Sequence, residues 1–294
     1  MMLRDKLRGT GVALVTPFTS DLKVDFDALG RVIDFVLRDG VEYLITLGTT
    51  GEAPTLSKEE KKEVIQFTYS KSDGRVPVVV GVGGNNTAEL LNDLETLPLD
   101  KAFAILSASP YYNKPSQEGL FQHYKALAAA TPKPIILYNV PGRTGRSISA
   151  ETVIRLATEV DNISGIKEAS GDMAQCMRIL RDKPSDFLVV SGDDALALPQ
   201  IACGMDGVIS VAANCFPKLF SEMVRMSLRG DFKSAKAFND KMIDGYTLLF
   251  NENNPAGVKA FLSESGMIEN FLRLPLVPLS PNGLAKIREY QKTL

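Results

Sequence analysis

The segment Ile163-Ser-Gly-Ile-Lys-Glu-Ala-Ser-Gly171 has the composition of a short buried β-strand with a lysine among its apolar and small residues. Turn-forming residues, Asp161-Asn162 and Gly171-Asp172, bound it on both sides. A solvated lysine is almost fully protonated at neutral pH, because its pKa lies near about 10.4. Burial of a lysine disfavours the charged form and supplies a neutral amine for Schiff-base chemistry. Lys167 is therefore a candidate nucleophile, and the alternative is a strand-end lysine that reaches solvent beside Glu168.

Strand-like runs of this kind alternate with helical patterns along the chain. We expect strands at residues 11–15, 43–47, 77–80, 102–106, 134–138, in the Lys167 segment, and at 187–190 and 207–211. Helices are expected at residues 25–38, after Ser57 with Glu60 as a capping box, and after Thr87, Ser116 and Ser149. This repeat predicts an α/β fold, a (β/α)8 TIM barrel over residues 1–229. An open doubly wound sheet is the alternative, but no G-x-G-x-x-G follows the first strand and no P-loop occurs.

Residues 230–294 form the second expected unit, a small helical region packed on the barrel. Its helical patterns are interrupted at Asn253-Asn254-Pro255 and by Pro275, Pro278 and Pro281. No Gly/Ser-rich linker separates it from the barrel, so we expect a rigid attachment.

Composition narrows the classes of function. A net charge of −2 gives no basic field for nucleic acid or an anionic membrane. No apolar run approaches the roughly 20 residues of a membrane span. Three widely spaced cysteines suggest neither a disulfide framework nor a zinc site, so a cytoplasmic location is expected. His123 is the only histidine, which argues against histidine-ligated metals and histidine-based triads. We expect His123 on a helix surface or at an interface, and neither a cofactor nor a metal.

Hydroxyl and phenol groups gather where the expected strands end. The active site of a barrel lies at the carboxyl ends of its strands. Those ends carry Thr16, Thr49-Thr50-Gly51-Glu52, Asn85, Tyr111-Tyr112-Asn113, Tyr138-Asn139, Lys167-Glu168, Gly192-Asp193-Asp194 and Asn214. Without histidine, protons of an imine reaction would have to pass between a phenol and neighbouring hydroxyls.

Each of these groups also has a simpler interpretation. Tyr111-Tyr112 could be interface or rim aromatics, and Thr49-Thr50 could cap a turn. Asp193-Asp194 could hold a metal, but a solvated turn or a helix cap is favoured, since no histidine or third carboxylate accompanies the pair. Arg143 could be an ordinary exposed arginine or a fork for a substrate carboxylate.

Five motifs of this chain resemble those of one enzyme family and occur in the same order as in that family. They are Gly48-Thr-Thr-Gly-Glu52, Tyr111-Tyr-Asn-Lys-Pro-Ser-Gln-Glu-Gly119, Tyr138-Asn-Val-Pro-Gly-Arg-Thr-Gly145, Ile166-Lys-Glu-Ala169 and Ser191-Gly-Asp-Asp194. The chain is similar from about Gly11 onward to the dihydrodipicolinate synthases of the class I pyruvate aldolase superfamily. The resemblance implies condensation of pyruvate with L-aspartate 4-semialdehyde through a lysine Schiff base, giving 4-hydroxy-tetrahydrodipicolinate in lysine and diaminopimelate biosynthesis.

The resemblance also implies roles for individual residues. Lys167 would form the imine and Tyr138 would donate and accept protons. Thr50 would link Tyr138 to Tyr112, which reaches into the neighbouring subunit's site and so implies at least an obligate dimer. The family is usually a homotetramer, a dimer of dimers, and a tetramer is expected here. The substrate-binding residues would be Thr49, Thr50, Arg143, Gly192 and the backbone at Ile209.

Two further expectations follow from the resemblance. Asn85, Glu89 and Tyr111 match an effector site for lysine, but the usual histidine is absent and the segment carries Lys58 and Lys61, so weak or absent inhibition by lysine is expected. Another class I 2-oxo-acid aldolase, similar to N-acetylneuraminate lyase or a 2-keto-3-deoxy sugar acid aldolase, is the alternative function. Arg143 and the Thr49-Thr50 pair favour the synthase.

Overall fold

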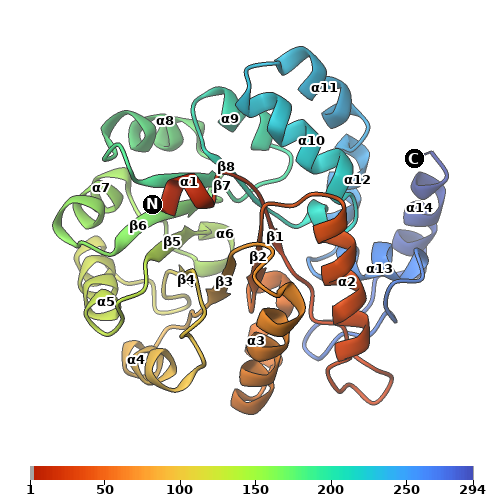
Figure 1. Ribbon diagram of the computed structural model, residues 1–294, viewed down its shortest axis with the longest axis horizontal. Coiled ribbons are helices and arrows are strands. Elements are labelled where there is room, and N and C mark those ends of the chain that lie inside the picture. The colour runs from red at the N-terminus through yellow and green to blue at the C-terminus, as the bar shows by residue number, and fades with distance from the viewer. Residues whose placement is uncertain (1–2, 294) are drawn as a thin grey trace.

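Eight parallel strands close into a barrel in which each strand pairs with the next and β8 returns to β1. The computed structural model describes residues 3–293, and Figure 1 shows the strands at its centre with helices around them. The strands are β1 Gly9–Ala13, β2 Tyr43–Thr46, β3 Val78–Gly81, β4 Ala104–Ala108, β5 Ile135–Asn139, β6 Ile163–Glu168, β7 Leu188–Ser191 and β8 Gly207–Ser210. The predicted (β/α)8 barrel is confirmed, and every expected strand is present within about two residues of its expected bounds.

The helices that follow the strands begin at the expected capping residues, except for the helix after β3. Asp25 caps α2 (Phe26–Arg38), and Ser57 and Glu60 form the expected capping box of α3 (Lys58–Ser72). Asn86, rather than Thr87, caps α4 (Thr87–Thr96). The remaining barrel helices are α1 Leu3–Lys6, α5 Gln117–Ala129, α6 Pro141–Thr144, α7 Ala150–Glu159, α8 Met173–Asp182, α9 Ala197–Ala202 and α10 Pro217–Leu228.

The core has two layers because side chains of a strand alternate between its faces. One layer lies between strands and helices and runs through the whole molecule. The other fills the barrel interior and includes Tyr43, Ile45, Ile136 and Tyr138. Leu7, which follows α1, belongs to this inner layer, so the N-terminal turn closes the end of the barrel where the strands begin.

Barrel closure depends on a close approach of two glycines. Gly207 in β8 pairs with Gly9 in β1 and has a φ of 150°, which favours glycine. A Cβ atom on Gly207 would lie 2.0 Å from the Gly9 carbonyl oxygen. Any side chain at this position would therefore push β8 away from β1.

Within the described residues, four helices follow the barrel: α11 Phe232–Asp240, α12 Ile243–Phe250, α13 Ala256–Glu264 and α14 Pro281–Gln291. In Figure 1 the blue helices α13 and α14 lie beside α2 at one edge of the molecule. Helix α13 is buried from Ala256 to Leu262. None of the helices within residues 3–293 is both long enough and apolar enough to cross a membrane.

Candidate active site

The lysine of the segment 163–171 faces a phenol inside the barrel. Lys167 on β6 and Tyr138 on β5 are directly paired in the register of these two strands, so their side chains share the inward face. They are 4% and 7% exposed, and the Lys167 Nζ atom lies 4.3 Å from the centre of the Tyr138 ring. The interpretation of Lys167 as a strand-end lysine reaching solvent is therefore wrong. The amine is held where a condensation with a carbonyl could occur away from bulk water.

Gly192, just after β7, leaves space for the lysine stem. A Cβ atom on Gly192 would lie 2.8 Å from Lys167 Cε and 2.6 Å from Ala169 Cβ. The Gly192 N–H also donates to the Glu168 carbonyl at 2.7 Å, which fixes the two chains at this distance. The structure thus places Gly192 against Lys167.

A buried polar contact lies on the opposite face of the same two strands. Asn139 and Glu168 directly follow Tyr138 and Lys167, and both are 0% exposed. The Asn139 amide donates to both Glu168 oxygens, at 3.0 and 2.9 Å. The Ser170 N–H and the Gln175 side chain also donate to this carboxylate. These contacts hold β5 and β6 in the register that pairs Tyr138 with Lys167.

Thr49 and Thr50 lie in the 3₁₀ turn η1 (Thr49–Gly51), which follows β2. Thr16 donates to the Gly51 carbonyl at 2.7 Å and so ties this turn to the end of β1. Thr50 is 2% exposed, and its Oγ1 accepts a hydrogen bond of 3.1 Å from the Asn254 side chain. The pair therefore does more than cap a turn, because one hydroxyl contacts the C-terminal region.

A cavity of about 530 Å³ opens beside these residues. Thr49, Tyr138, Arg143 and Asn254 line it. Arg143, in α6, is exposed, and its Nη2 donates to the Asn254 carbonyl at 3.3 Å. A guanidinium at the cavity wall suits a carboxylate ligand.

The two tyrosines after β4 lie at the surface of the chain. Tyr111 is 43% exposed and lines the cavity together with Asn85, Glu89 and Lys61. Tyr112 is 88% exposed and has a φ of 71°. An aromatic side chain as exposed as Tyr112 can be buried only by the surface of another molecule.

Asp193 and Asp194 differ in their surroundings, and the expectation of a solvated turn is wrong for Asp194. Asp193 caps the turn after β7 by accepting from the Ala195 N–H at 3.0 Å. Asp194 is 2% exposed and accepts from the backbone N–H groups of Val211 and Ala212, just after β8. Burial raises the pKa of Asp194 to about 6. Asp194 thus fixes the chain that follows Ile209, which is 1% exposed on β8.

The expectation for the single histidine is also wrong. His123 in α5 is 5% exposed, and its Nδ1 lies 2.8 Å from the Thr87 hydroxyl of α4. Burial lowers the pKa of His123 to about 4, so the ring is neutral at physiological pH. Its position in a helical pattern did not reveal which face of the helix packs against α4. Among residues 3–293, no three His, Cys, Asp or Glu side chains are grouped so that they could hold a metal ion.

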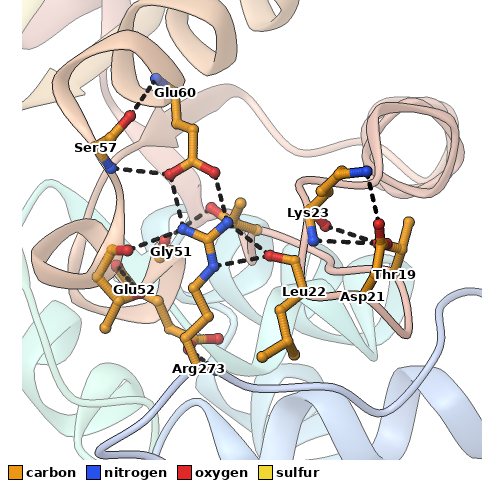
Figure 2. Close-up of polar contacts among 11 residues, drawn as sticks. Thr19, Asp21, Leu22, Lys23, Gly51, Glu52, Ser57, Glu60 and Arg273 are labelled. Atoms are coloured by element: carbon orange, nitrogen blue, oxygen red, sulfur yellow. Dashed lines mark hydrogen bonds and ion pairs between the residues drawn. The ribbon is translucent and has the colours of Figure 1, made fainter.

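A cluster of charged residues holds the turn that carries the threonines. Figure 2 shows the Arg273 guanidinium between Glu60 and the Leu22 carbonyl, with Glu52 beside its backbone. The Arg273 N–H donates to Glu52 at 3.2 Å, and Arg273 contacts lower the pKa of Glu60. Lys259 of α13 pairs with Glu52, and neither side chain is exposed. Burial lowers the pKa of Lys259 to about 8, an effect that the Glu52 carboxylate opposes.

Sequence patterns did not identify three of these groups as parts of the site. In the sequence, Asn254 is marked only by the break between two helical patterns, and no motif contains Lys259 or Arg273. Their sequence distance from the threonine turn exceeds 200 residues for Asn254 and Arg273. A lysine in the otherwise apolar run of α13 was the one available signal, because a buried lysine needs a partner.

A buried lysine amine facing a phenol at the carboxyl ends of barrel strands is the arrangement of a Schiff-base-forming lyase. The chain belongs to the dihydrodipicolinate synthetase family, whose model matches residues 6–293. It is 50% identical over 288 residues to the 4-hydroxy-tetrahydrodipicolinate synthase of Parabacteroides distasonis, covering 98% of this chain and 97% of that protein.

Solved structures of the family have the same fold. A dihydrodipicolinate synthase from Thermotoga maritima superposes with a TM-score of 0.95 at 40% identity, over 98% of each chain. A chloride-inhibited dihydrodipicolinate synthase from Acinetobacter baumannii, complexed with pyruvate, has a TM-score of 0.94 at 41% identity, over 97% of this chain and 98% of that one.

Proposed function

We propose that this chain condenses pyruvate with L-aspartate 4-semialdehyde to give 4-hydroxy-tetrahydrodipicolinate. The observation that carries the proposal is the Lys167 amine, 4% exposed, over the Tyr138 ring at 4.3 Å. Family membership over residues 6–293 and the 50% identity to the Parabacteroides distasonis synthase support the same reaction. A lysine held out of water can attack the ketone of pyruvate without first losing a full hydration shell.

The amine would attack the pyruvate carbonyl and form a carbinolamine, which loses water to give an imine at Lys167. Loss of a proton from the methyl group gives an enamine, whose carbon attacks the aldehyde of the second substrate. The amine of that substrate would then attack the imine carbon, which closes the ring and releases Lys167. Each step moves a proton, and Tyr138 is the phenol beside the amine. Thr50 would connect Tyr138 with Tyr112 for this transfer.

The remaining roles follow from position. Thr49 and Thr50, with the backbone at Ile209, would bind the pyruvate carboxylate. Gly192 keeps the adjoining space open beside Lys167. Arg143, exposed on the cavity wall, would bind the carboxylate of the aldehyde substrate.

A second subunit would complete the site. Tyr112 is 88% exposed, and Leu274 and Val277 are 78% and 59% exposed. A partner that covers Tyr112 would place its phenol in the neighbouring site, consistent with a homotetramer assembled as a dimer of dimers. The expected cytoplasmic location and the boundary between residues 1–229 and 230–294 are retained as parts of this proposal.

The cavity extends toward the effector residues Asn85, Glu89 and Tyr111, and Lys61 lies on the same wall. Lys58 is turned toward Asp93, at 3.9 Å. The Lys61 ammonium would repel a bound lysine. We therefore expect added lysine to leave steady-state activity almost unchanged, and strong inhibition well below millimolar lysine would contradict this expectation.

Borohydride trapping tests the proposed chemistry. Reduction in the presence of pyruvate should attach the substrate carbon skeleton irreversibly to Lys167, as read by peptide mass analysis. Lys259 is an internal control, because it is a second buried lysine but is paired with Glu52. Lys167→Met should abolish both the adduct and the activity with aspartate semialdehyde. An adduct on Lys259 alone, or none, would contradict the proposal.

A further inference from the structure

Asn254 joins two groups of the proposed site from outside the barrel. It lies between α12 and α13 and is 5% exposed. Its Nδ2 donates to Thr50 Oγ1 at 3.1 Å, whereas its backbone carbonyl accepts from Arg143 Nη2 at 3.3 Å. One residue thus contacts the proposed relay hydroxyl with its side chain and the proposed carboxylate-binding arginine with its backbone.

The Asn254 side chain is held rigidly relative to Thr50. Helix α13 begins two residues later and is buried through its first two turns. Lys259 of that helix pairs with Glu52, which lies two residues after Thr50. Both partners of the Asn254–Thr50 hydrogen bond are therefore anchored by the same buried ion pair.

The direction of this hydrogen bond limits what the threonine hydroxyl can do. A hydroxyl carries one proton and two acceptor positions. An amide N–H that donates to Thr50 Oγ1 occupies one acceptor position and cannot accept the hydroxyl proton. One acceptor position and one proton remain, so the hydroxyl can receive a proton from one neighbour and donate its own to another.

We propose that Asn254 is a positioning residue that orients the Thr50 hydroxyl for proton transfer to and from Tyr138. This inference rests on the proposed function, in which Thr50 connects Tyr138 with Tyr112. Asn254 acts through Thr50 and does not itself contact the reacting atoms.

Stability alone does not explain this asparagine. The buried Asn254 Oδ1 has no hydrogen-bond partner among the described residues. A buried acceptor without a partner destabilises a fold. Only the amide nitrogen is satisfied, and it contacts the relay threonine.

A double-mutant cycle tests whether Asn254 acts through Thr50. The variants are Asn254→Ala, Thr50→Val and their combination, assayed for kcat and for both KM values. We expect each single substitution to lower kcat by about 10-fold or more, and the combination to be no slower than Thr50→Val alone. KM for aspartate semialdehyde should change little on Asn254→Ala, because Arg143 contacts the backbone carbonyl, which the substitution retains. Losses that multiply would overturn the proposal.

The pH dependence of kcat in Asn254→Asp distinguishes a positioning role from a purely structural one. An ionised carboxylate at this position accepts the Thr50 proton and diverts it from the relay, whereas a protonated carboxyl can donate as the amide does. We expect kcat relative to the wild type to be lowest at high pH and to recover as pH falls. A ratio that is flat with pH would overturn the proposal, as would failure of both Asn254 variants to fold. A wild-type protein without synthase activity would instead overturn the proposed function.

Discussion

At the scale of single residues, burial decides chemical behaviour more than residue type does. Lys167 and Lys259 are both buried, yet only Lys167 is free of a carboxylate partner among the contacts described above. Lys259 is engaged by Glu52 and by the Phe271 carbonyl at 2.9 Å. A lysine whose donors are occupied by the fold is unsuited to attack a ketone. This difference between two buried amines favours Lys167 as the proposed nucleophile.

Burial of His123 predicts a pH dependence of stability. The folded-state pKa of about 4 lies below the value of about 6.5 expected for an unfolded chain. Between these values the unfolded chain binds a proton that the folded chain does not, so the free energy of unfolding falls as pH falls. Over the full window the loss is about 3 kcal/mol. Chemical unfolding at several pH values should show this loss.

His123→Gln is the matched control, because glutamine does not titrate and can still contact the Thr87 hydroxyl. Other groups titrate near the lower limit, so the informative quantity is the free energy of unfolding of the wild type minus that of the variant. This quantity should decrease as pH falls from about 6.5 to about 4. Parallel pH profiles for the two proteins would show that His123 is not the cause.

At the scale of elements, the C-terminal segment fixes the threonine turn. Arg273 contacts the loop before α2 at Leu22, the turn η2 at Thr55 and the first turn of α3 at Glu60. Its guanidinium lies 4.5 Å from the centre of the Phe18 ring. Glu52 adopts a φ of 52° between η1 and η2 (Ala53–Thr55), and it pairs with Lys259 of α13. The helices after the barrel therefore stabilise the loops that carry the site.

Arg273→Lys tests this attachment. Lysine keeps the charge but cannot make the forked contacts to Glu60 and the Leu22 carbonyl shown in Figure 2. We expect a loss of about 1–3 kcal/mol in the free energy of unfolding. Arg181→Lys is the control, since Arg181 pairs with Asp182 at the surface and should change stability by less than about 0.5 kcal/mol. Equal effects of the two substitutions would contradict a special role of Arg273.

At the scale of the whole molecule, a second subunit would complete the proposed relay. The two groups of the proposed relay that belong to one chain, Tyr138 and Thr50, are 7% and 2% exposed. Tyr112 is 88% exposed and stands apart from them at the surface. A symmetric dimer would exchange this tyrosine between two identical sites.

Mixed subunits test the exchange. Lys167→Ala lacks the nucleophile and Tyr112→Phe lacks the exchanged phenol, so each assembly alone should be impaired. In a mixed dimer, the Tyr112→Phe subunit keeps Lys167 and receives Tyr112 from its partner. An equal mixture, dissociated and reassembled, should recover about a quarter of wild-type activity in a steady-state assay. A mixture no more active than the average of its components would argue against a tyrosine shared between subunits.

The barrel could be predicted from the sequence because strand and helix periodicities are local properties. The sequence predicted the strand positions and the capping box at Ser57 and Glu60, and both predictions are confirmed. The predicted placement of Lys167 and Tyr138 near strand ends is also confirmed. The expectations for His123 and Asp194 were wrong, because each depended on which neighbouring element covers the residue. The local sequence pattern predicts whether a segment is a helix or a strand. It does not always predict which face of that element becomes buried.

The sequence by itself determined the order of elements, the closed barrel and the residue types gathered at the ends of its strands, since these follow from spacing along the chain. Only the tertiary structure brought Asn254, Lys259 and Arg273 to the threonine turn and paired Asn139 with Glu168 behind the active-site strands. Contacts between residues so distant along the chain form only when the elements pack, because side-chain hydrogen bonds and ion pairs require approach within a few ångströms.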